Sequence, residues 1–355
     1  MQQRRLGRHG LQVSRLGLGT MTWGRDTDAE ESAQQLRAFL DAGGTFVDTA
    51  ASYSDGDAER VLGALLAGGH AGSAGSAGTA DASRGGPGGE PGAVVARDEL
   101  VIATKAGISR RTGERVVDVS RRALLDTLDA SLARLHTDHV DLWQVHTWSD
   151  EVPLSETLGA LDAAVATGRA RYVGISNYSG WQTAAAATWQ AAWPGRAVLA
   201  STQVEYSLLA RDVEREVLDA AEACGLGVLA WSPLGRGVLT GKYRAGIPAD
   251  SRAASPHLAS FVEPYLAQGP RRVVDAVITA ADGLGCAPLE VAIAWVRDRP
   301  GVTAAIVGAR TAAQLRGSLA AEDITLPDQI RQALDDASDP ASLAASPLPS
   351  RGAGA

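Results

Sequence analysis

The segment SRRALLDTLDASLARLHTDHVDLWQVH (residues 120–146) carries the pattern that decides the fold. In residues 120–136, apolar side chains recur at helical spacing, and Ser120 precedes them as a helix N-cap should. In residues 140–146, an apolar run of strand length ends at a polar residue, His146. The segment therefore predicts a helix followed by a strand.

The same alternation recurs along the chain. Strands are predicted at 15–20, 45–50, 100–105, 140–146, 171–177, 200–207, 227–234 and 304–310, and helices at 28–43, 120–136, 154–167, 179–192, 211–224, 270–284, 288–299 and 311–320. Alternating strands and helices imply parallel pairing through right-handed crossovers. Eight such units favour a closed barrel over an open doubly wound sheet. We expect an α/β fold, a single (β/α)8 TIM barrel.

Three segments lie outside this alternation. The N-terminus reads as a hairpin that turns at His9 and Gly10 and that could plug the barrel floor. Residues 68–93 are a low-complexity, Gly-rich stretch, which we interpret as a disordered insertion. We expect this insertion at the barrel end opposite the active site. The barrel itself is expected to be a single domain spanning residues 1–340. Residues 341–355 are expected to form a flexible tail.

The loop after the seventh strand, about residues 232–269, has a different composition. It leaves the strand at the end where barrel enzymes build their sites. It contains Arg236, Lys242, Arg244, Arg252, Phe261 and Tyr265. A long, basic and aromatic loop at that position indicates a lid over an anionic ligand.

The amino-acid composition indicates which binding partners and which cellular compartment to expect. Lys and Arg number 33 against 41 Asp and Glu, a net charge of −8, which argues against nucleic acid or an anionic membrane as partner. There is no apolar run long enough to span a membrane and no secretory signal pattern. The two cysteines, Cys224 and Cys286, lie in apolar contexts, so we expect a reduced, cytoplasmic protein. We predict no metal site.

Polar residues end several predicted strands. Taken singly, Asp48 could cap a turn, Lys105 could be solvated, His146 could be a hydrogen-bonded core residue, and Tyr53 could only pack a loop. In a barrel, however, the carboxyl ends of the strands surround one cavity. The strand ends carry Asp48, Lys105, His146, Asn177, Gln203 and Trp231, with Tyr53 five residues after Asp48.

An acid, a phenol, an amine and an imidazole at one mouth have a definite chemical use. A free tyrosine titrates near pH 10, and a nearby ammonium lowers that pKa. A carboxylate keeps the amine charged, and a histidine can orient a carbonyl oxygen. Such a set can give a proton to a developing alkoxide or take one from an alcohol. No side chain supplies a hydride, so a nicotinamide cofactor is implied.

These residues lie in motifs that resemble the aldo-keto reductase superfamily over nearly the whole chain. In order they are GLGTMTWG, FVDTAASY, IATKAG, VDLWQVH, GRARYVGISNYS, TQVEYSLL, LAWSPLGRGVLTGKY and IVGARTAAQL. Within the superfamily, GKYRAGIPADSRA makes the chain most similar to bacterial aldo/keto reductases related to potassium channel β-subunits.

The resemblance implies a catalytic tetrad. It consists of Asp48, Tyr53, Lys105 and His146. Tyr53 would be the general acid in reduction and the base in oxidation. Lys105, paired with Asp48, would depress the Tyr53 pKa, and His146 would position the substrate carbonyl. Trp23, Tyr53, His146 and Trp148 could form the wall of the substrate pocket, although Trp148 could equally be an ordinary packing residue.

The resemblance also implies NADP(H), rather than NAD(H), bound across the barrel top. Arg252 matches the arginine that meets the 2′-phosphate, and Trp231 the ring that stacks on the nicotinamide. Where the family usually has Glu and Asn against adenine, this chain has Gly317 and Ser318. The implied cofactor residues are Gly19, Thr20, Met21, Asp48, Ser176, Asn177, Gln203, Trp231, Ser232, Pro233, Leu234, Gly237, Lys242, Arg252, Gly308, Arg310 and Gln314.

The implied function is NADP(H)-dependent reduction of aldehydes or ketones to alcohols, on a small-molecule carbonyl substrate, by a monomer or homo-oligomer. One alternative is a ketoreductase of secondary metabolites or deoxysugars. A non-enzyme alternative is an NADPH-binding, redox-sensing regulatory subunit.

Overall fold

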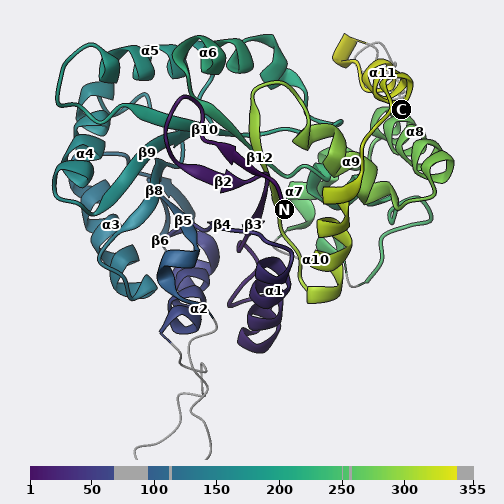
Figure 1. The fold of residues 1–355 in the computed structure, drawn as a ribbon, viewed down its shortest axis with the longest axis horizontal. Helices are drawn as coiled ribbons and strands as arrows, with labels where there is room; N and C mark the ends of the chain where they lie inside the picture. Colours follow the sequence, from purple (N-terminus) through teal and green to yellow (C-terminus); the bar gives the residue numbers. More distant parts are fainter. Residues whose placement is uncertain (68–94, 112–113, 250, 256–257, 342–355) are drawn as a thin grey trace, which may run out of the picture.

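The eight predicted barrel strands all form. The structure is a computed structural model that describes residues 1–67, 95–111, 114–249, 251–255 and 258–341. The strands pair in parallel and close on themselves in the order β10-β11-β12-β3-β4-β5-β8-β9 (Figure 1). They are β3 (Leu16–Gly19), β4 (Phe46–Asp48), β5 (Val101–Ala106), β8 (Val140–Val145), β9 (Ala170–Ser176), β10 (Leu199–Glu205), β11 (Gly227–Trp231) and β12 (Val302–Val307). The (β/α)8 barrel is confirmed.

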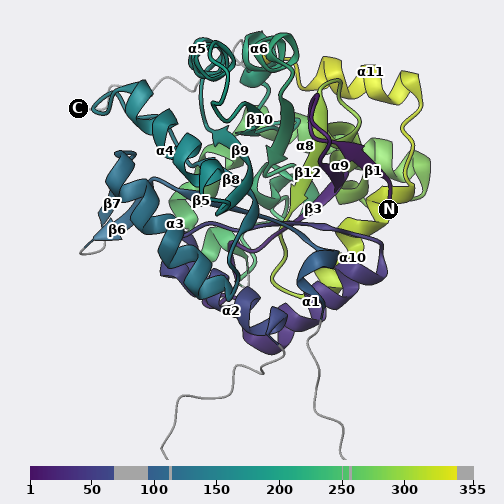
Figure 2. The same cartoon turned by 60° about the vertical axis from the view of Figure 1, so that its left-hand side comes forward.

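Helices surround the barrel, and local sequence sets where several of them begin. Asp28 accepts from the backbone N–H of Glu31 at the start of the first helix, and Ser120 caps the third in the same way. Ser179 and Gln182 form a capping box. The helices, seen around the sheet in Figure 2, are α1 (Ala29–Asp41), α2 (Asp57–Leu66), α3 (Arg121–Leu135), α4 (Leu154–Ala166), α5 (Gly180–Ala191), α6 (Val217–Cys224), α8 (Gln268–Leu284), α9 (Pro288–Arg297), α10 (Ala312–Leu319) and α11 (Asp328–Ala337).

The N-terminal hairpin closes the barrel floor. It pairs β1 (Gln3–Arg5) with β2 (Gln12–Ser14) in antiparallel register. Leu6 and Val13 are fully buried against residues that fill the lower barrel, among them Phe46. Gly7 has a φ of 58°, and a Cβ there would lie 2.4 Å from the carbonyl oxygen of Gly225, so this close approach requires glycine.

The loop after β11 is built from short helical turns. They are η4 (Gly235–Thr240), η5 (Arg252–Ala254), α7 (Ala259–Val262) and η6 (Glu263–Leu266). This segment leaves the barrel at the carboxyl ends of the strands, where the predicted lid should lie.

Some elements were not predicted from the sequence. Besides α2 and α11, these include a hairpin of β6 (Ile108–Arg111) and β7 (Glu114–Val117), and 3-10 turns such as η2 (Arg97–Glu99). The helix predicted at 211–224 breaks at Glu216, whose φ and ψ are not helical, into η3 (Asp212–Arg215) and α6. The low-complexity stretch 68–93 lies outside the described residues, as does nearly all of the expected tail.

The length and the apolar content of each helix decide whether it could span a membrane. Among the described helices, none on its own is long and apolar enough to span a membrane. Helices α8 and α9 meet the criterion only when taken together across a bend of 101°.

Candidate active site

Asp48, Lys105 and Tyr53 meet at the top of the barrel. Asp48 is the last residue of β4, and Lys105 lies in the neighbouring strand β5. The Lys105 Nζ donates to Asp48 Oδ2 at 2.7 Å, to the carbonyl oxygen of Thr49 at 2.9 Å, and to the Tyr53 hydroxyl at 3.2 Å. Gln203 Nε2 donates a hydrogen bond to the other carboxylate oxygen, Asp48 Oδ1, at 2.8 Å. Lys105 and Asp48 are almost completely buried, so this ion pair is held in one geometry.

Charge sets the protonation of Lys105, whereas burial sets that of Tyr53. Burial lowers the pKa of Lys105, but Asp48 and Tyr53 outweigh it and raise that pKa, so the ammonium stays charged. Burial raises the pKa of Tyr53, and the Lys105 ammonium only partly offsets the rise. Lys105 thus lowers the Tyr53 pKa as expected, but the rise caused by burial is larger, so the net pKa lies above its ordinary value. The phenol is therefore protonated at neutral pH and is poised to donate.

His146 follows β8 and faces Tyr53. The two rings lie edge to face with centroids 6.0 Å apart. Burial and the charges of Lys105 and Arg115 lower the pKa of His146 well below its usual value, so the imidazole is neutral. Tyr53 and His146 can therefore both offer a hydrogen to one oxygen atom.

A chain of hydrogen bonds joins the ends of three further strands. Asn177 has a φ of 60° and donates from Nδ2 to the carbonyl oxygen of His146 at 2.9 Å. Its Oδ1 accepts from Trp231 Nε1 at 3.0 Å. Ser176 Oγ donates to the carbonyl oxygen of Gln203 at 2.9 Å. These contacts hold three side chains assigned to the cofactor, Ser176, Asn177 and Trp231, in fixed positions.

A cavity of about 530 Å³ opens above these strand ends. Tyr53 and His146 line it, together with all but one of the residues assigned to the cofactor. Those lining residues are Gly19, Met21, Asp48, Ser176, Asn177, Gln203, Trp231, Ser232, Pro233, Leu234, Gly237, Lys242, Arg252, Gly308, Arg310 and Gln314.

Besides the buried Lys105, three assigned residues do not line this cavity. Thr20 is fully buried, with its hydroxyl on the carbonyl oxygen of Asp48. Trp23 is also fully buried, and its ring N–H donates to Gln35 in α1, so it packs the core rather than a substrate wall. Trp148 lies beside the site and packs edge to face on Tyr178 and Trp181.

The cavity also has walls that we did not assign from the sequence. Five of them are apolar, and nothing in the sequence distinguishes an apolar cavity wall from an apolar core residue. These walls are Thr22, Thr240, Leu289, Ile306, Val307, Ala309 and Ala313.

Three cations gather around one part of the cavity. Burial lowers the pKa of Arg252, and the neighbouring charge of Arg310 lowers it further. Burial likewise lowers the pKa of Lys242, with Arg252 and Arg310 adding to the effect. Clustered cations of this kind fit the phosphates of a dinucleotide. Within the described ranges, no group of three or more His, Cys, Asp or Glu residues could hold a metal ion.

Comparison with known proteins identifies the family of this chain. The sequence profile of the aldo/keto reductase family matches residues 15–339. The chain belongs to the aldo/keto reductase family. The oxidoreductase YrpG of Bacillus subtilis, named as uncharacterized, is 34% identical over 95% of both chains.

Two further relatives have contrasting names. A probable voltage-gated potassium channel subunit beta of Oryza sativa is 33% identical, over 91% of this chain and 92% of the relative. The L-glyceraldehyde 3-phosphate reductase of Escherichia coli K12 is 32% identical, over 90% of this chain and 87% of the relative. This aldo/keto reductase is thus an oxidoreductase-family barrel with relatives among both enzymes and channel subunits.

Proposed function

We propose that this aldo/keto reductase is a cytoplasmic NADP(H)-dependent enzyme that reduces aldehydes or ketones to alcohols. The observation that carries the proposal is the buried Asp48–Lys105–Tyr53 cluster, which opens into a cavity whose wall includes three cations. A proton donor and an anion-binding region thus share one cavity. The free cysteines Cys224 and Cys286 suit a reducing compartment.

The residues around the cavity fit a nicotinamide dinucleotide. Ser176, Asn177, Gln203 and Trp231 would hold the nicotinamide end, while Lys242, Arg252 and Arg310 would hold the phosphates, including a 2′-phosphate. Bound NADPH supplies the hydride that no side chain can provide.

The protein's own contribution is the proton and the orientation of the carbonyl. The neutral His146 and the protonated Tyr53 would hydrogen-bond the carbonyl oxygen and polarise it. Tyr53 would then pass its proton to the developing alkoxide, and the Lys105 ammonium at 3.2 Å would stabilise the phenolate that remains. Asp48 keeps Lys105 charged and fixed in place.

The proposal is tested by replacing one hydroxyl. Purified protein should oxidise NADPH when given 4-nitrobenzaldehyde, and Tyr53→Phe should lower that rate by a factor of about 10²–10⁴. Its affinity for NADP⁺, measured by fluorescence titration, should stay near that of the wild type. Tyr172→Phe is the matched control, because Tyr172 packs on His9 at the barrel floor. A Tyr53→Phe enzyme with the wild-type rate would overturn the assigned mechanism.

A second candidate is a redox-sensing regulatory subunit, which the similarity to relatives named as potassium channel β-subunits favours. It predicts slow NADPH oxidation that no carbonyl compound accelerates. A carbonyl panel should include a phosphorylated aldehyde, since one relative is named as L-glyceraldehyde 3-phosphate reductase.

A further inference from the structure

Arg236 connects three segments at the rim of the cavity. It lies in η4, after β11, and its guanidinium forms a two-point ion pair with Glu205, the last residue of β10. The Nε···Oε1 distance is 2.7 Å and the Nη2···Oε2 distance is 2.6 Å. Its Nη1 donates to the carbonyl oxygen of Phe261 in α7 at 2.5 Å. Both side chains of the ion pair are mostly buried, at 16% and 17% exposure, so solvent screens the contact little.

The same guanidinium is packed among aromatic rings. It lies 3.8 Å from the centroid of Phe261 and 4.9 Å from that of Tyr265. Phe261 in turn stacks on Trp231, with centroids 6.3 Å apart and planes 17° apart. Arg236, Phe261 and Trp231 all line the cavity. A planar guanidinium can form a bidentate ion pair with a carboxylate and at the same time stack on an aromatic ring.

The backbone at Arg236 is in a conformation that side chains disfavour. Its φ is 58°, between Gly235 at 53° and Gly237 at 95°. A residue with a Cβ persists there only when its surroundings over-determine it, and the contacts to Glu205 and the lid supply that constraint.

Trp231 is consequently held at two points. Its ring nitrogen donates to Asn177, and its face is covered by Phe261, which Arg236 secures. Removal of the guanidinium would free Phe261, would take the cation off the face of Tyr265, and would leave Glu205 without its ion-pair partner.

We propose that Arg236 is a positioning residue that fastens the cover segment, residues 259–266, to the end of β10 and onto Trp231, and so slows the exchange of cofactor. This inference rests on the proposed NADP(H) site. In this proposal, Arg236 does not touch the reacting atoms. It acts through Phe261 and Trp231, and its loss opens the nicotinamide side of the cavity.

The test compares two arginines of the same loop. Arg236→Ala should release NADP⁺ roughly tenfold faster in stopped-flow fluorescence, because it breaks a largely desolvated pair. Arg244→Ala is the control, because Arg244 does not line the cavity although it belongs to the loop predicted as a lid. It pairs with Asp275 at 3.1 Å, but the two side chains are 59% and 56% exposed. The control should release NADP⁺ at the wild-type rate. Arg236→Lys should recover part of the slow release, because it keeps the charge but not the planar fork.

A second readout needs no cofactor. Hydrogen–deuterium exchange of residues 259–266 in the free protein should be faster in Arg236→Ala than in the wild type and in the control. If Arg236→Ala does not fold, Phe261→Leu, which strands no buried charge, should show the same faster release and exchange. Wild-type release and exchange in a folded variant would overturn the inference. Failure of the wild type to bind NADP⁺ would instead refute the proposed function, and the exchange comparison would still test the fastening.

Discussion

At the scale of single residues, the sequence predicted where the site residues lie better than it predicted their protonation states. Asp48, Lys105 and His146 each end a strand or lie next to its end, and the barrel brings them together as predicted. The protonation states of Tyr53 and His146 depend on burial, which a sequence does not report. Burial outweighs Lys105 at Tyr53, and it makes His146 neutral.

Gly317 is the residue whose change is easiest to interpret. It lies inside α10 and lines the cavity, and a Cβ placed on it would meet nothing within 4 Å. Gly317→Glu should therefore fit, should restore the acidic side chain that the family usually places against adenine, and should lower the Kd for NADP⁺. Fluorescence titration of both NADP⁺ and NAD⁺ measures the effect.

A control separates binding from helix stability. Gly283 lies in α8, where an added Cβ would likewise meet nothing within 4 Å, and it does not line the cavity. Gly317→Ala and Gly283→Ala should each stabilise the fold by about 0.5–1 kcal/mol, because glycine disfavours helix. A Gly317→Glu variant that binds NADP⁺ no better than Gly317→Ala would show that this position does not contact adenine.

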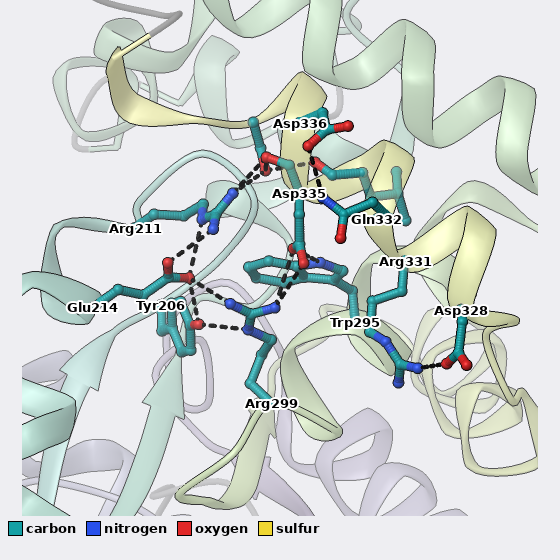
Figure 3. A network of polar contacts seen from close by, with 12 residues as sticks. Tyr206, Arg211, Glu214, Trp295, Arg299, Asp328, Arg331, Gln332, Asp335 and Asp336 are labelled. Atoms are coloured by element: carbon teal, nitrogen blue, oxygen red, sulfur yellow. Dashed lines mark hydrogen bonds and ion pairs between the residues drawn. The ribbon is translucent and has the colours of Figure 1, made fainter.

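At the scale of elements, α11 is held to the barrel by contacts with residues far away in the sequence, which a local sequence pattern does not reveal. Asp335 of α11 accepts from the Trp295 ring N–H at 2.8 Å and from Arg299 at 3.1 and 3.0 Å (Figure 3). Arg299 also contacts Tyr206 and Glu214, which follow β10. This network ties the carboxyl-terminal helix to the barrel through residues far apart in the chain.

Asp335→Ala should lower the free energy of unfolding by about 1–3 kcal/mol, because it leaves Trp295 and Arg299 donors without their acceptor. Urea denaturation measures the loss. The neighbouring Asp336 is exposed, and among the contacts described its carboxylate accepts only an i−4 bond from Gln332. Asp336→Ala should therefore cost less than about 0.5 kcal/mol. Equal losses in the two variants would contradict the structural role of the network.

At the scale of the whole molecule, the two ends of the barrel have separate tasks. Strand carboxyl ends carry the cavity, whereas the hairpin and the helix-to-strand connections lie at the other end. The low-complexity stretch belongs to the connection between α2, which ends at Leu66, and η2, which begins at Arg97 just before β5.

Replacement of residues 68–93 by a short Gly-Ser linker should leave NADP⁺ affinity and carbonyl reduction within about twofold of the wild type, because loop length changes closure entropy only slowly. Titration and steady-state kinetics on the purified variant measure both. A folded deletion variant with a large loss of turnover would mean that this stretch reaches the active site.

The sequence by itself determined the elements whose causes are local. Alternating apolar runs and helix caps predicted the eight strands and most helices, and the strand ends predicted the polar cluster. The tertiary structure decided what depends on distant partners. It buried Trp23 against Gln35, raised the pKa of Tyr53, paired Arg236 with Glu205, and anchored α11 through Asp335. Hydrogen bonds, desolvation and ion pairs arise between residues far apart in the chain, and no local pattern contains them.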